Sequence, residues 1–505
     1  MNFAHHVRQA ARDRPGRTAL TDPGRSVTFA ELDAETDAFA NALAELGVDP
    51  GDRVALYLPN SISFVAAYFG TMKRGAIPFP INLRFEGEEI SYVLEDGGAR
   101  VVVTAGPFED AIADLDAGSV EELVVAGGDR GRDYASLVEQ HAGHHEVHPR
   151  KEAELADIMY TSGTTGRPKG VRHTHQNLST NARAILTRME WSANDVGLTV
   201  NPCFHVAGLH VTVSPFLVSG TTNHLLADWD PATALSTVEE HGVTTSFCIA
   251  TIIVDLVNFE DAASYDTSTL SVVGCGGSPM PKERISTFEE RYDATLVEGY
   301  GMTETTPAAA LNHPGEDAVR KPGSIGTVIA DVVDVRIEDP ESGEPVQRGE
   351  LGELLWHGDT VTPGYYNLPE ENEAAFVQRE GKRWLRSGDI ARMDEDGHLF
   401  IEDRIDDMLI TGGENVYPRE VEDVLYLLDG VAEAAVFGTP HERLGEQVTA
   451  AIVRDDDALD DDTVERHCRE HLAGFKIPRR IQFVDAMPRT STRKIDKVAL
   501  RERLE

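Results

Sequence analysis

The sequence predicts an α/β protein with three parts: a large N-terminal region of mostly parallel sheets covered by helices, a small β-rich segment, and a small α+β unit at the C-terminus. Up to about residue 330, short apolar runs alternate with segments of helical periodicity, as in parallel strands joined by helices. After that, short apolar runs separated by Pro, Gly and Asp turns indicate antiparallel strands. A chain of 505 residues is too long for one ordinary core. We therefore expect two domains, residues 1–403 and 404–505.

The first elements are predicted from residues 28–106. Thr28 and Glu31 have the spacing of a capping box, an apolar face follows them, and Gly47 ends the pattern, so we expect a helix here. Three apolar runs follow, with helical segments between them. Buried strands are therefore expected at 53–59, 76–82 and 99–106.

The C-terminal region mixes helices and strands. A helix is expected to begin at Pro418, because proline suits the first turn of a helix. Strands are expected near 431–438, 447–454 and 480–485, and a second helix near 463–472. No repeat and no low-complexity linker separates this region from the rest, so we expect a tight hinge near residue 404 rather than a flexible tether.

The formal net charge of −40 is the unusual feature of the composition, and only nine of the 46 basic residues are lysines. Nucleic acid is not expected as a partner, because binding it requires a basic surface. Acidic runs such as residues 454–463 repel each other unless salt screens them. We therefore expect a salt-loving source organism, with an ordinary acidic protein as the alternative.

The remaining composition points to the cytoplasm. No stretch of about 20 apolar residues predicts a membrane span. Residues 1–17 carry charges and histidines where a signal peptide has an apolar run. The four cysteines form no C-x-x-C pair and fit a reducing compartment. The sequence leaves open whether the chain forms a homodimer and whether it contacts a membrane surface.

Residues 160–170, YTSGTTGRPKG, have the composition of a phosphate-binding loop. Hydroxyl groups and glycines let backbone and side chains approach oxyanions, and Lys169 adds a positive charge. The loop is not a Walker A motif, because Pro168 stands where that motif needs glycine and Gly170 where it needs Ser or Thr. A solvated turn is the alternative. The candidate phosphate contacts are Thr161, Ser162, Gly163, Thr164, Thr165, Gly166 and Lys169.

Six further motifs follow in order. They are NPCFHVAG (201–208), GCGGSPMP (274–281), EGYGMTET (298–305), WLRSGDIA (384–391), DRIDDMLITGGENVYPREVE (403–422) and PRTSTRKIDK (488–497). With them the sequence resembles, over nearly its whole length, the adenylate-forming (AMP-forming) acyl-CoA synthetases, relatives of firefly luciferase and of the adenylation domains of peptide synthetases. The resemblance implies two half-reactions. A carboxylic acid attacks ATP to give acyl-AMP and pyrophosphate, and CoA then takes the acyl group.

The resemblance also implies a role for individual residues around ATP. Glu304 matches the family's magnesium ligand, and a hard cation on phosphate oxygens suits a carboxylate. Thr303 would donate to the α-phosphate and Tyr300 would offer its ring to adenine, with core packing as the alternative for Tyr300. Asp389 would bind the ribose hydroxyls, with a turn aspartate as the alternative. The ATP and AMP contacts implied outside the loop are Gly276, Gly277, Ser278, Tyr300, Gly301, Thr303, Asp389, Arg404 and Lys494.

Lys494 is the residue expected to act in the first half-reaction, where a lysine brought in by a mobile C-terminal lid stabilises charge on the α-phosphoryl oxygens. The family usually has glycine before this lysine, whereas this chain has Arg493. Asp406 matches the hinge about which the lid turns between the half-reactions. The CoA contacts implied are Gly412, Gly413, Lys476 and Arg479, and Leu444 stands where the family often has tryptophan.

The acyl pocket is expected at His205, Gly276, Gly299 and Gly301. His205 resembles the family's gate between pocket and tunnel, and a core histidine is the alternative. Family members limited to short acids carry tryptophan at the position of Gly301, so Gly301→Trp is expected to favour short acids. Each buried methylene gains about 0.8 kcal/mol, so an open channel favours a medium- or long-chain fatty acid and a role in lipid metabolism. Aromatic acids and loading of a carrier protein are the alternatives.

Two other possibilities belong to different classes. The run HAGHHEVH places His141, His144, His145 and His148 together. Zinc binding is considered for them, but the run lacks a regular ligand frame, so a solvated loop is expected. The whole chain could also be a non-catalytic nucleotide-binding protein, but Lys494, Glu304 and Asp389 together favour an enzyme.

Overall fold

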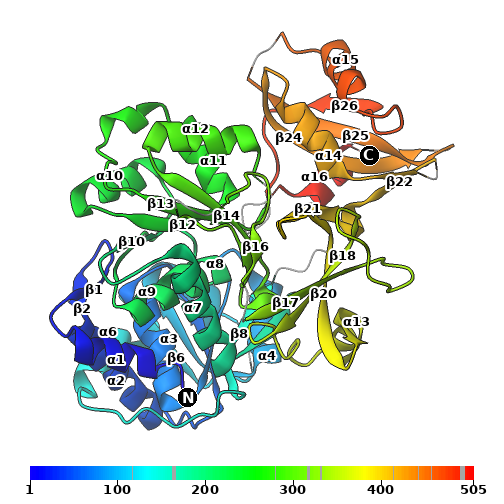
Figure 1. The fold of residues 1–505 in the computed structure, drawn as a ribbon. Helices are drawn as coiled ribbons and strands as arrows, with labels where there is room; N and C mark the ends of the chain where they lie inside the picture. Colours follow the sequence, from blue (N-terminus) through cyan, green and yellow to red (C-terminus); the bar gives the residue numbers. More distant parts are fainter. Residues whose placement is uncertain are drawn as a thin grey trace. The chain divides into compact units, whose positions relative to one another are not determined.

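The structure, a computed structural model, describes residues 1–115, 118–161, 167–278, 280–315, 319–329, 332–412, 414–441, 443–455, 458–489 and 495–504. The chain forms two compact units (Figure 1). The first comprises Met1–Asp334 and Trp356–Leu385, and the second comprises Val335–Leu355 and Arg386–Glu505. The second unit thus starts before the expected boundary at 403/404, and that boundary stays a prediction.

The largest sheet of the first unit has nine strands in the order β16-β15-β14-β13-β12-β10-β11-β1-β2. Their bounds are β1 Thr18–Thr21, β2 Ser26–Thr28, β10 Val196–Thr199, β11 Thr222–Leu225, β12 Thr245–Ile249, β13 Val272–Gly276, β14 Thr295–Gly301, β15 Ala308–Leu311 and β16 Thr327–Val328. The six central strands, β14, β13, β12, β10, β11 and β1, run parallel, whereas β2 at one end and β15 and β16 at the other pair antiparallel. Helices α10 (Pro231–His241), α11 (Ala250–Asn258) and α12 (Lys282–Tyr292) accompany β12 and β13 (Figure 1).

A second sheet has the order β4-β3-β5-β6-β7, and all its strands are parallel. The strands are β3 Arg53–Tyr57, β4 Ile77–Pro80, β5 Ala99–Ala105, β6 Glu122–Ala126 and β7 Arg132–Asp133. The helices of this region are α1 His5–Asp13, α2 Phe29–Glu45, α3 Ile62–Arg74, α4 Gly87–Gly97, α5 Glu109–Ala113 and α6 Tyr134–Gln140. The predicted capping box is confirmed, since Thr28 Oγ1 accepts from Glu31 N–H and the Glu31 carboxylate accepts from Thr28 N–H.

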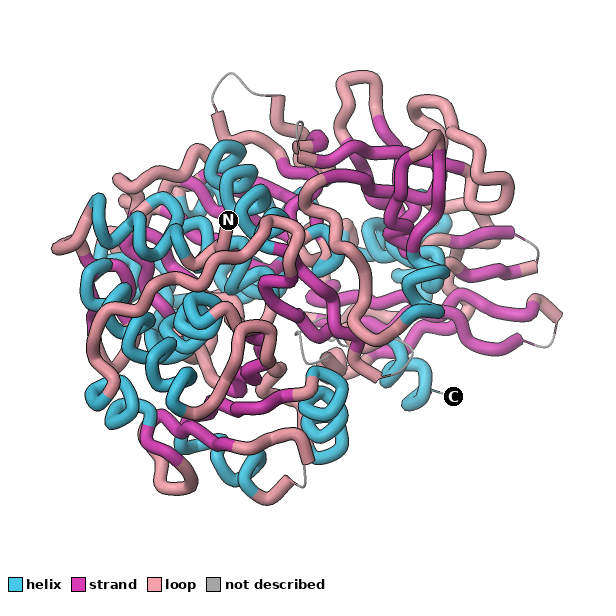
Figure 2. Tube along the Cα trace, turned by 90° about the horizontal axis from the view of Figure 1, so that it is seen from below, coloured by secondary structure: helices cyan, strands magenta, loops and turns pink. Residues whose placement is uncertain are grey.

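The hairpin of β8 (Leu155–Thr161) and β9 (Lys169–Thr174) lies at the base of the predicted phosphate loop. Helix α7 (His175–Met189) follows it directly, and α8 (Val206–Gly208), a π-helical segment (Leu209–Val213) and α9 (Ser214–Ser219) come later. Figure 2 shows the helices of the chain in cyan and its strands in magenta, and the last described element is a helix.

The β-rich segment forms a sheet of order β17-β18-β20-β19, with β21 paired to β20. Its elements are β17 Val333–Glu338, β18 Gly352–Gly358, α13 Pro369–Ala375, β19 Phe376–Arg379, β20 Lys382–Met393 and β21 Leu399–Arg404. Strands β18 and β20 each contain residues of both units.

The C-terminal elements are β22 Leu409–Thr411, β23 Glu414–Val416, α14 Pro418–Tyr426, β24 Val431–His441, β25 Gly445–Arg454, α15 Asp461–His471, β26 Arg480–Phe483 and α16 Lys497–Leu504. The sheet order is β23-β22-β25-β24, with β26 parallel to β25. The predicted helix start at Pro418 is confirmed, and so is the α/β class as a whole. Within the described residues, no helix is both long and apolar enough to cross a membrane.

Candidate functional site

The base of the predicted phosphate loop is the end of the β8–β9 hairpin at which β8 finishes and β9 begins. Thr161 pairs with Lys169 across the hairpin, and Thr161 Oγ1 donates to the Lys169 carbonyl oxygen at 3.3 Å. The ammonium of Lys169 lies 5.5 Å from the centroid of the Tyr365 ring. The loop residues Ser162, Gly163, Thr164, Thr165 and Gly166 lie outside the described residues.

Residues 362–366 run alongside β9 and bring Tyr365 to this place. Tyr365 forms an isolated β-bridge with Val171, and the N–H of Tyr366 donates to the Gly170 carbonyl at 2.7 Å. The Thr362 hydroxyl donates to the Arg172 carbonyl at 2.6 Å. Tyr365 is a site residue that the sequence reasoning missed, since its partners lie far away along the chain.

Glu304 lies in the 3-10 turn Thr303–Thr305 and is 8% exposed. Its Oε1 accepts a 2.8 Å hydrogen bond from the Tyr365 hydroxyl, and its carbonyl accepts from Thr362 N–H at 2.8 Å. No lysine, arginine or histidine that the structure describes is ion-paired with Glu304. A buried carboxylate held by a neutral donor is suited to a bound cation, because burial of an unpaired charge is costly. The donor set therefore fits the magnesium ion that the sequence implies.

The Thr303 carbonyl is bonded to a buried imidazole: His173 Nε2 lies 2.8 Å from it, and His173 Nδ1 lies 2.8 Å from Asp157 Oδ1. His173 and Asp157 face each other across the β8–β9 hairpin. The hairpin thus flanks the predicted phosphate loop and also contacts, through His173, the turn that carries Thr303 and Glu304. The sequence reasoning missed both residues.

The predicted adenine contacts lie at the ends of β13 and β14. A Cβ on Gly276 would lie 2.8 Å from the Gly299 carbonyl oxygen and 3.0 Å from Phe247 Cζ, so this close approach requires glycine. Gly277 has φ +84°, a conformation that side chains disfavour. Ser278 follows it directly.

Tyr300 is half-buried and stacks on Trp356, with the ring centroids 5.7 Å apart. One face of Tyr300 therefore takes part in packing, as the alternative supposed, and the residue is still partly exposed. Packing and adenine contact are thus compatible for this residue.

Gly299 and Gly301 are both surrounded closely. A Cβ on Gly301 would lie 1.6 Å from the Pro307 carbonyl oxygen, and one on Gly299 would lie 2.2 Å from Leu311 Cδ1. Because the Pro307 contact is backbone, any side chain at Gly301 requires the backbone to move. Gly301→Trp is therefore not a clean test of pocket size.

His205 is half-buried and caps α8, where its Nδ1 accepts from the Ala207 N–H at 3.2 Å. The segment after it joins an apolar cluster that includes Ala207, Val211, Phe247 and Leu311. Phe247 also lies against Gly276, so the predicted acyl-pocket residues border this cluster.

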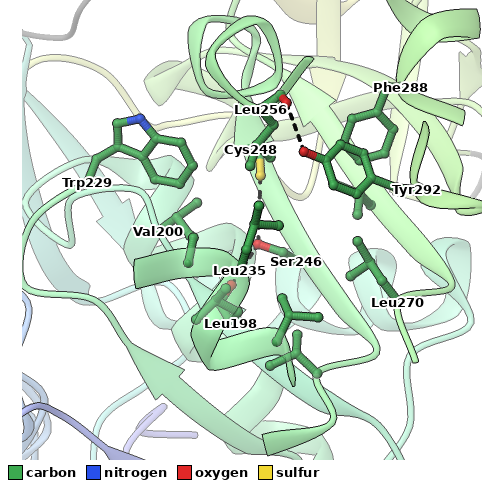
Figure 3. Close-up of a pocket in the computed structure, with 14 residues that line it drawn as sticks. Leu198, Val200, Trp229, Leu235, Ser246, Cys248, Leu256, Leu270, Phe288 and Tyr292 are labelled. Carbon is green, nitrogen blue, oxygen red and sulfur yellow. Dashed lines mark hydrogen bonds between the residues drawn. The ribbon is translucent and has the colours of Figure 1, made fainter. Parts of the chain in front are cut away.

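A separate apolar cavity of about 30 Å³ lies within the first unit, where α10, α11 and α12 pack on the sheet (Figure 3). Leu235, Cys248, Leu256 and Phe288 are among its lining residues, and none of the predicted acyl-pocket residues lines it. This cavity belongs to the core and is too small for a fatty acid.

Asp389 and Arg404 lie opposite each other on β20 and β21 in the second unit. Arg404 Nη1 is 4.0 Å from Asp389 Oδ1, and the N–H of Asp389 donates to Ser387 Oγ at 3.0 Å. Asp389 is 7% exposed. The structure therefore brings the two predicted ribose contacts together.

The predicted CoA contacts differ in their surroundings. Gly412 has φ +63°, and its N–H donates to the Leu444 carbonyl at 3.0 Å. Lys476 Nζ lies 2.6 Å from Glu420 Oε2, so this lysine is engaged in an ion pair, whereas Arg479 is exposed. Gly413 and the side chain of the expected hinge residue Asp406 lie outside what the structure describes.

Lys494 also lies outside the described residues, but both flanks of its loop are described. Arg489 and Ile495 form an isolated antiparallel bridge. Lys497 Nζ lies 2.8 Å from Glu422 Oε1, which ties the start of α16 to α14. The two described residues that flank this segment therefore lie next to each other.

The histidine run at 141–148 contacts helix α2. His141 Nε2 lies 2.5 Å from Glu45 Oε2, His144 Nδ1 lies 3.2 Å from Asp37 Oδ2, and His145 Nδ1 lies 2.7 Å from Asn41 Oδ1. The run is thus anchored to α2, and within it His144 is exposed while His141 and His145 are half-buried. The ligand-type atoms that lie close together are elsewhere, at Asp157, His173 and His210.

Comparisons with known proteins agree over nearly the whole chain. The family model described as AMP-binding enzyme matches residues 7–366, and the model of the AMP-binding enzyme C-terminal domain matches residues 420–494. The chain is 37% identical over 494 residues to a feruloyl-CoA synthase of Amycolatopsis sp, covering 98% of this chain and 97% of that protein. It is 35% identical over 513 residues to the long-chain-fatty-acid–CoA ligase FadD13 of Mycobacterium tuberculosis, covering 99% and 98%.

The solved structure of the anthranilate CoA ligase AuaEII in complex with anthranoyl-AMP is similar to the whole chain, with a TM-score of 0.93 and 28% identity. The alignment covers 100% of this chain and 97% of that one. The family models and the relatives point to the same family. This chain belongs to the AMP-binding enzyme family and is an AMP-forming acyl-CoA synthetase.

Proposed function

We propose that this ligase activates a medium- or long-chain fatty acid as acyl-AMP, releases pyrophosphate, and transfers the acyl group to CoA. The observation that carries the proposal is the position of Phe247, which lies against Gly276 and belongs to the apolar cluster that contains Ala207 and Val211. An acid with an extended apolar body gains about 0.8 kcal/mol for each methylene buried in such surroundings. Acetate gains almost none of this energy.

An aromatic acid is the second candidate. It is favoured by the relative named feruloyl-CoA synthase, which is 37% identical, and by the similar structure of an anthranilate CoA ligase. A flat ring would also pack well against an apolar cluster with an aromatic member, because aromatic pairs gain about 0.5–1.5 kcal/mol beyond area burial.

ATP is the proposed co-substrate, and this chain's own residues would hold it. Thr303 and Lys169 would contact phosphate oxygens, together with the loop of Ser162, Gly163, Thr164, Thr165 and Gly166. Glycines 276 and 277, Ser278 and Tyr300 would contact adenine, while Asp389 and Arg404 would bind the ribose. Glu304 would hold Mg²⁺, which neutralises charge on the departing pyrophosphate.

The C-terminal residues are proposed to act in turn. Lys494 would stabilise charge on the α-phosphoryl oxygens in the first half-reaction. Gly412 and Gly413 would line the path of the pantetheine arm in the second, with Lys476 and Arg479 at the CoA nucleotide. Lys476 would have to exchange its ion pair with Glu420 for a phosphate contact.

A pyrophosphate-release assay with a panel of acids tests the proposal. Fatty acids of increasing length, aromatic acids and acetate are each supplied with ATP and Mg²⁺, with and without CoA. Pyrophosphate release together with CoA-dependent thioester formation is the expected result. Acyl-AMP formation without thioester would indicate transfer to a carrier protein, and ATP binding without release would indicate a non-catalytic protein.

We also propose that the charge of −40 adapts the enzyme to a salt-rich, reducing cytoplasm. Self-repulsion between carboxylates falls as salt screens it. The four cysteines support a reducing compartment, because all are free and buried.

A further inference from the structure

A buried polar cluster of Tyr68, Asp157, His173 and His210 lies beneath the turn that carries Glu304. All four side chains are fully buried, at 0% exposure. They come from α3, β8, β9 and the π-helical segment Leu209–Val213. Polar groups in an apolar interior are costly unless they are paired, so a cluster of four requires a reason.

Both carboxylate oxygens of Asp157 have a hydrogen-bond partner. Its Oδ2 accepts from the Tyr68 hydroxyl at 2.5 Å, and its Oδ1 lies 2.8 Å from His173 Nδ1. His210 Nε2 lies 2.9 Å from Oδ2, but the geometry is not that of a directed hydrogen bond. Although burial alone would favour the neutral acid, the imidazoles of His173 and His210 hold the pKa of Asp157 well below its usual range.

The contacts of His173 determine where its protons are. A backbone carbonyl accepts but cannot donate, so the nitrogen 2.8 Å from the Thr303 oxygen, Nε2, must carry a proton. The other nitrogen, Nδ1, faces the Asp157 carboxylate, which also only accepts. His173 therefore donates from Nε2 to the Thr303 carbonyl while Nδ1 faces Asp157, so the ring connects Asp157 to the Thr303 backbone.

We propose that His173, held by Asp157, is a positioning residue for adenylation: its bond to the Thr303 carbonyl sets the turn that presents Thr303 and Glu304 to MgATP. This inference rests on the proposed function, because it assumes that MgATP binds at this turn.

The turn is fixed at several points, and the bond from His173 ties the Thr303 carbonyl to β9. The carbonyl of Glu304 is bonded separately by the Thr362 N–H, and the carboxylate by Tyr365. The Thr306 hydroxyl donates to the Thr360 carbonyl at 2.7 Å. Removing the His173 donor leaves the Thr303 carbonyl with the Thr306 N–H, 3.2 Å away inside the same turn, and without its bond to β9, so the turn is expected to shift relative to β9.

Two substitutions at His173 separate its two bonds. In His173→Gln, the amide nitrogen can replace Nε2 and reach the Thr303 carbonyl. In His173→Asn, the amide nitrogen replaces Nδ1 and reaches only Asp157. His210→Asn is the matched control, since it makes the same change in an equally buried imidazole that contacts Asp157 but not Thr303.

Calorimetric titration with MgATP, without an acid, is the decisive measurement. We expect His173→Asn to raise the Kd for MgATP by about tenfold, and His173→Gln and His210→Asn to stay within about threefold of wild type. In steady-state assays, His173→Asn should raise KM for MgATP and leave KM for the acid unchanged. Equal weakening by His173→Asn and His173→Gln, or by His173→Asn and His210→Asn, would overturn the proposal.

Two further measurements keep the outcomes distinct. If His173→Asn does not fold, Asp157→Asn takes its place, and an unchanged MgATP affinity in that variant contradicts the proposal. Stoichiometric metal in the dialysed wild-type protein, lost in both His173→Asn and His210→Asn, would replace the hydrogen-bonded cluster by a metal site. If the wild type binds MgATP but releases no pyrophosphate with any acid, the proposed function fails, while the binding comparison still tests His173.

Discussion

The Tyr365 hydroxyl donates a 2.8 Å hydrogen bond to Oε1 of Glu304, although 61 residues separate the two along the chain. Backbone contacts between β9 and residues 362–366 bring the tyrosine there. The ammonium of Lys169 lies over the face of the same ring, 5.5 Å from its centroid. Tyr365 therefore joins the base of the phosphate loop to the proposed magnesium ligand.

Tyr365→Phe is expected to weaken the binding of Mg²⁺ by Glu304, because the Tyr365 hydroxyl orients the carboxylate. A hydrogen bond to a charged group contributes about 1.5–3 kcal/mol, so the Mg²⁺ concentration for half-maximal pyrophosphate release should rise about tenfold or more. Tyr366→Phe is the control, since it removes the hydroxyl group of the neighbouring tyrosine, which is also half-buried. Equal Mg²⁺ requirements in the two variants would show that the hydroxyl does not orient Glu304.

Lys494→Ala is expected to separate the two half-reactions. Adenylation should fall by about 10² or more, as when one transition-state donor is removed. The variant should still convert supplied acyl-AMP and CoA to thioester. Arg493→Gly, which restores the residue usual in the family, is the control and should keep both steps. Equal loss of both half-reactions in Lys494→Ala would contradict a role confined to the first.

Stability should fall in mild acid because of His175. Its Nδ1 accepts from the Phe3 N–H at 3.1 Å, and burial, followed by Arg150, lowers its pKa to about 4. The unfolded chain takes up a proton near pH 6.5 and the folded chain does not until about pH 4, so stability is lost as pH falls through this window, by at most about 3 kcal/mol.

His175→Asn checks that assignment, because the amide oxygen can still accept from Phe3 and does not titrate. Urea unfolding between pH 7.5 and 4.5 should show a smaller loss of unfolding free energy in this variant than in wild type. The same pH slope in both proteins would remove His175 as the cause.

The parts of the fold that the sequence predicted well are those set by local signals. The start of α2 depends on Thr28 and Glu31, three residues apart, and α14 begins at Pro418, where the sequence predicts it. In contrast, His173 and Thr303 are 130 residues apart, and no local pattern relates them. The hydrogen bond between Tyr365 and Glu304 could not be predicted for the same reason, because the two residues lie 61 positions apart.

Glycine positions show a different limit. The sequence shows that Gly301 lacks a side chain, but only the structure shows that its Cβ direction points at the Pro307 carbonyl oxygen. Similarly, the sequence placed four histidines together, yet the carboxylate and amide partners of three of them come from α2, about 100 residues earlier. Composition identifies chemical groups, and packing decides which groups they meet.

Salt is expected to stabilise the enzyme. With 86 acidic and 46 basic residues, the native state repels itself at low ionic strength. The Debye length falls to about 3 Å at 1 M salt, so repulsion between separated carboxylates should be largely screened. We expect Tm and activity to rise as KCl is raised from 0.1 M to about 2 M. A Tm that stays flat or falls over this range would contradict adaptation to salt.

Substrate length gives the most direct test of the acyl pocket. If the acid lies against the cluster of Ala207, Val211 and Phe247, each added methylene should raise kcat/KM by about fourfold until the channel ends. We therefore expect efficiency to increase from acetate to at least octanoate, with an aromatic acid as the comparison. A wild-type enzyme that prefers acetate would rule out an open apolar pocket.

Phe247→Leu should then change which acid is preferred. The Phe247 ring lies 3.0 Å from where a Gly276 Cβ would be, so the smaller leucine opens space beside the predicted pocket residues. We expect kcat/KM for acids longer or bulkier than octanoate to rise relative to kcat/KM for octanoate. Such a rise would indicate that the channel ends at the Phe247 ring. Phe216→Leu is the matched control: Phe216 belongs to the same cluster, but its ring lies against Gly197 rather than Gly276. Both variants should lose core packing energy, on the order of 1–2 kcal/mol, which melting curves will report. If the two variants shift acid preference equally, the effect comes from general loosening of the core, and Phe247 does not line the pocket.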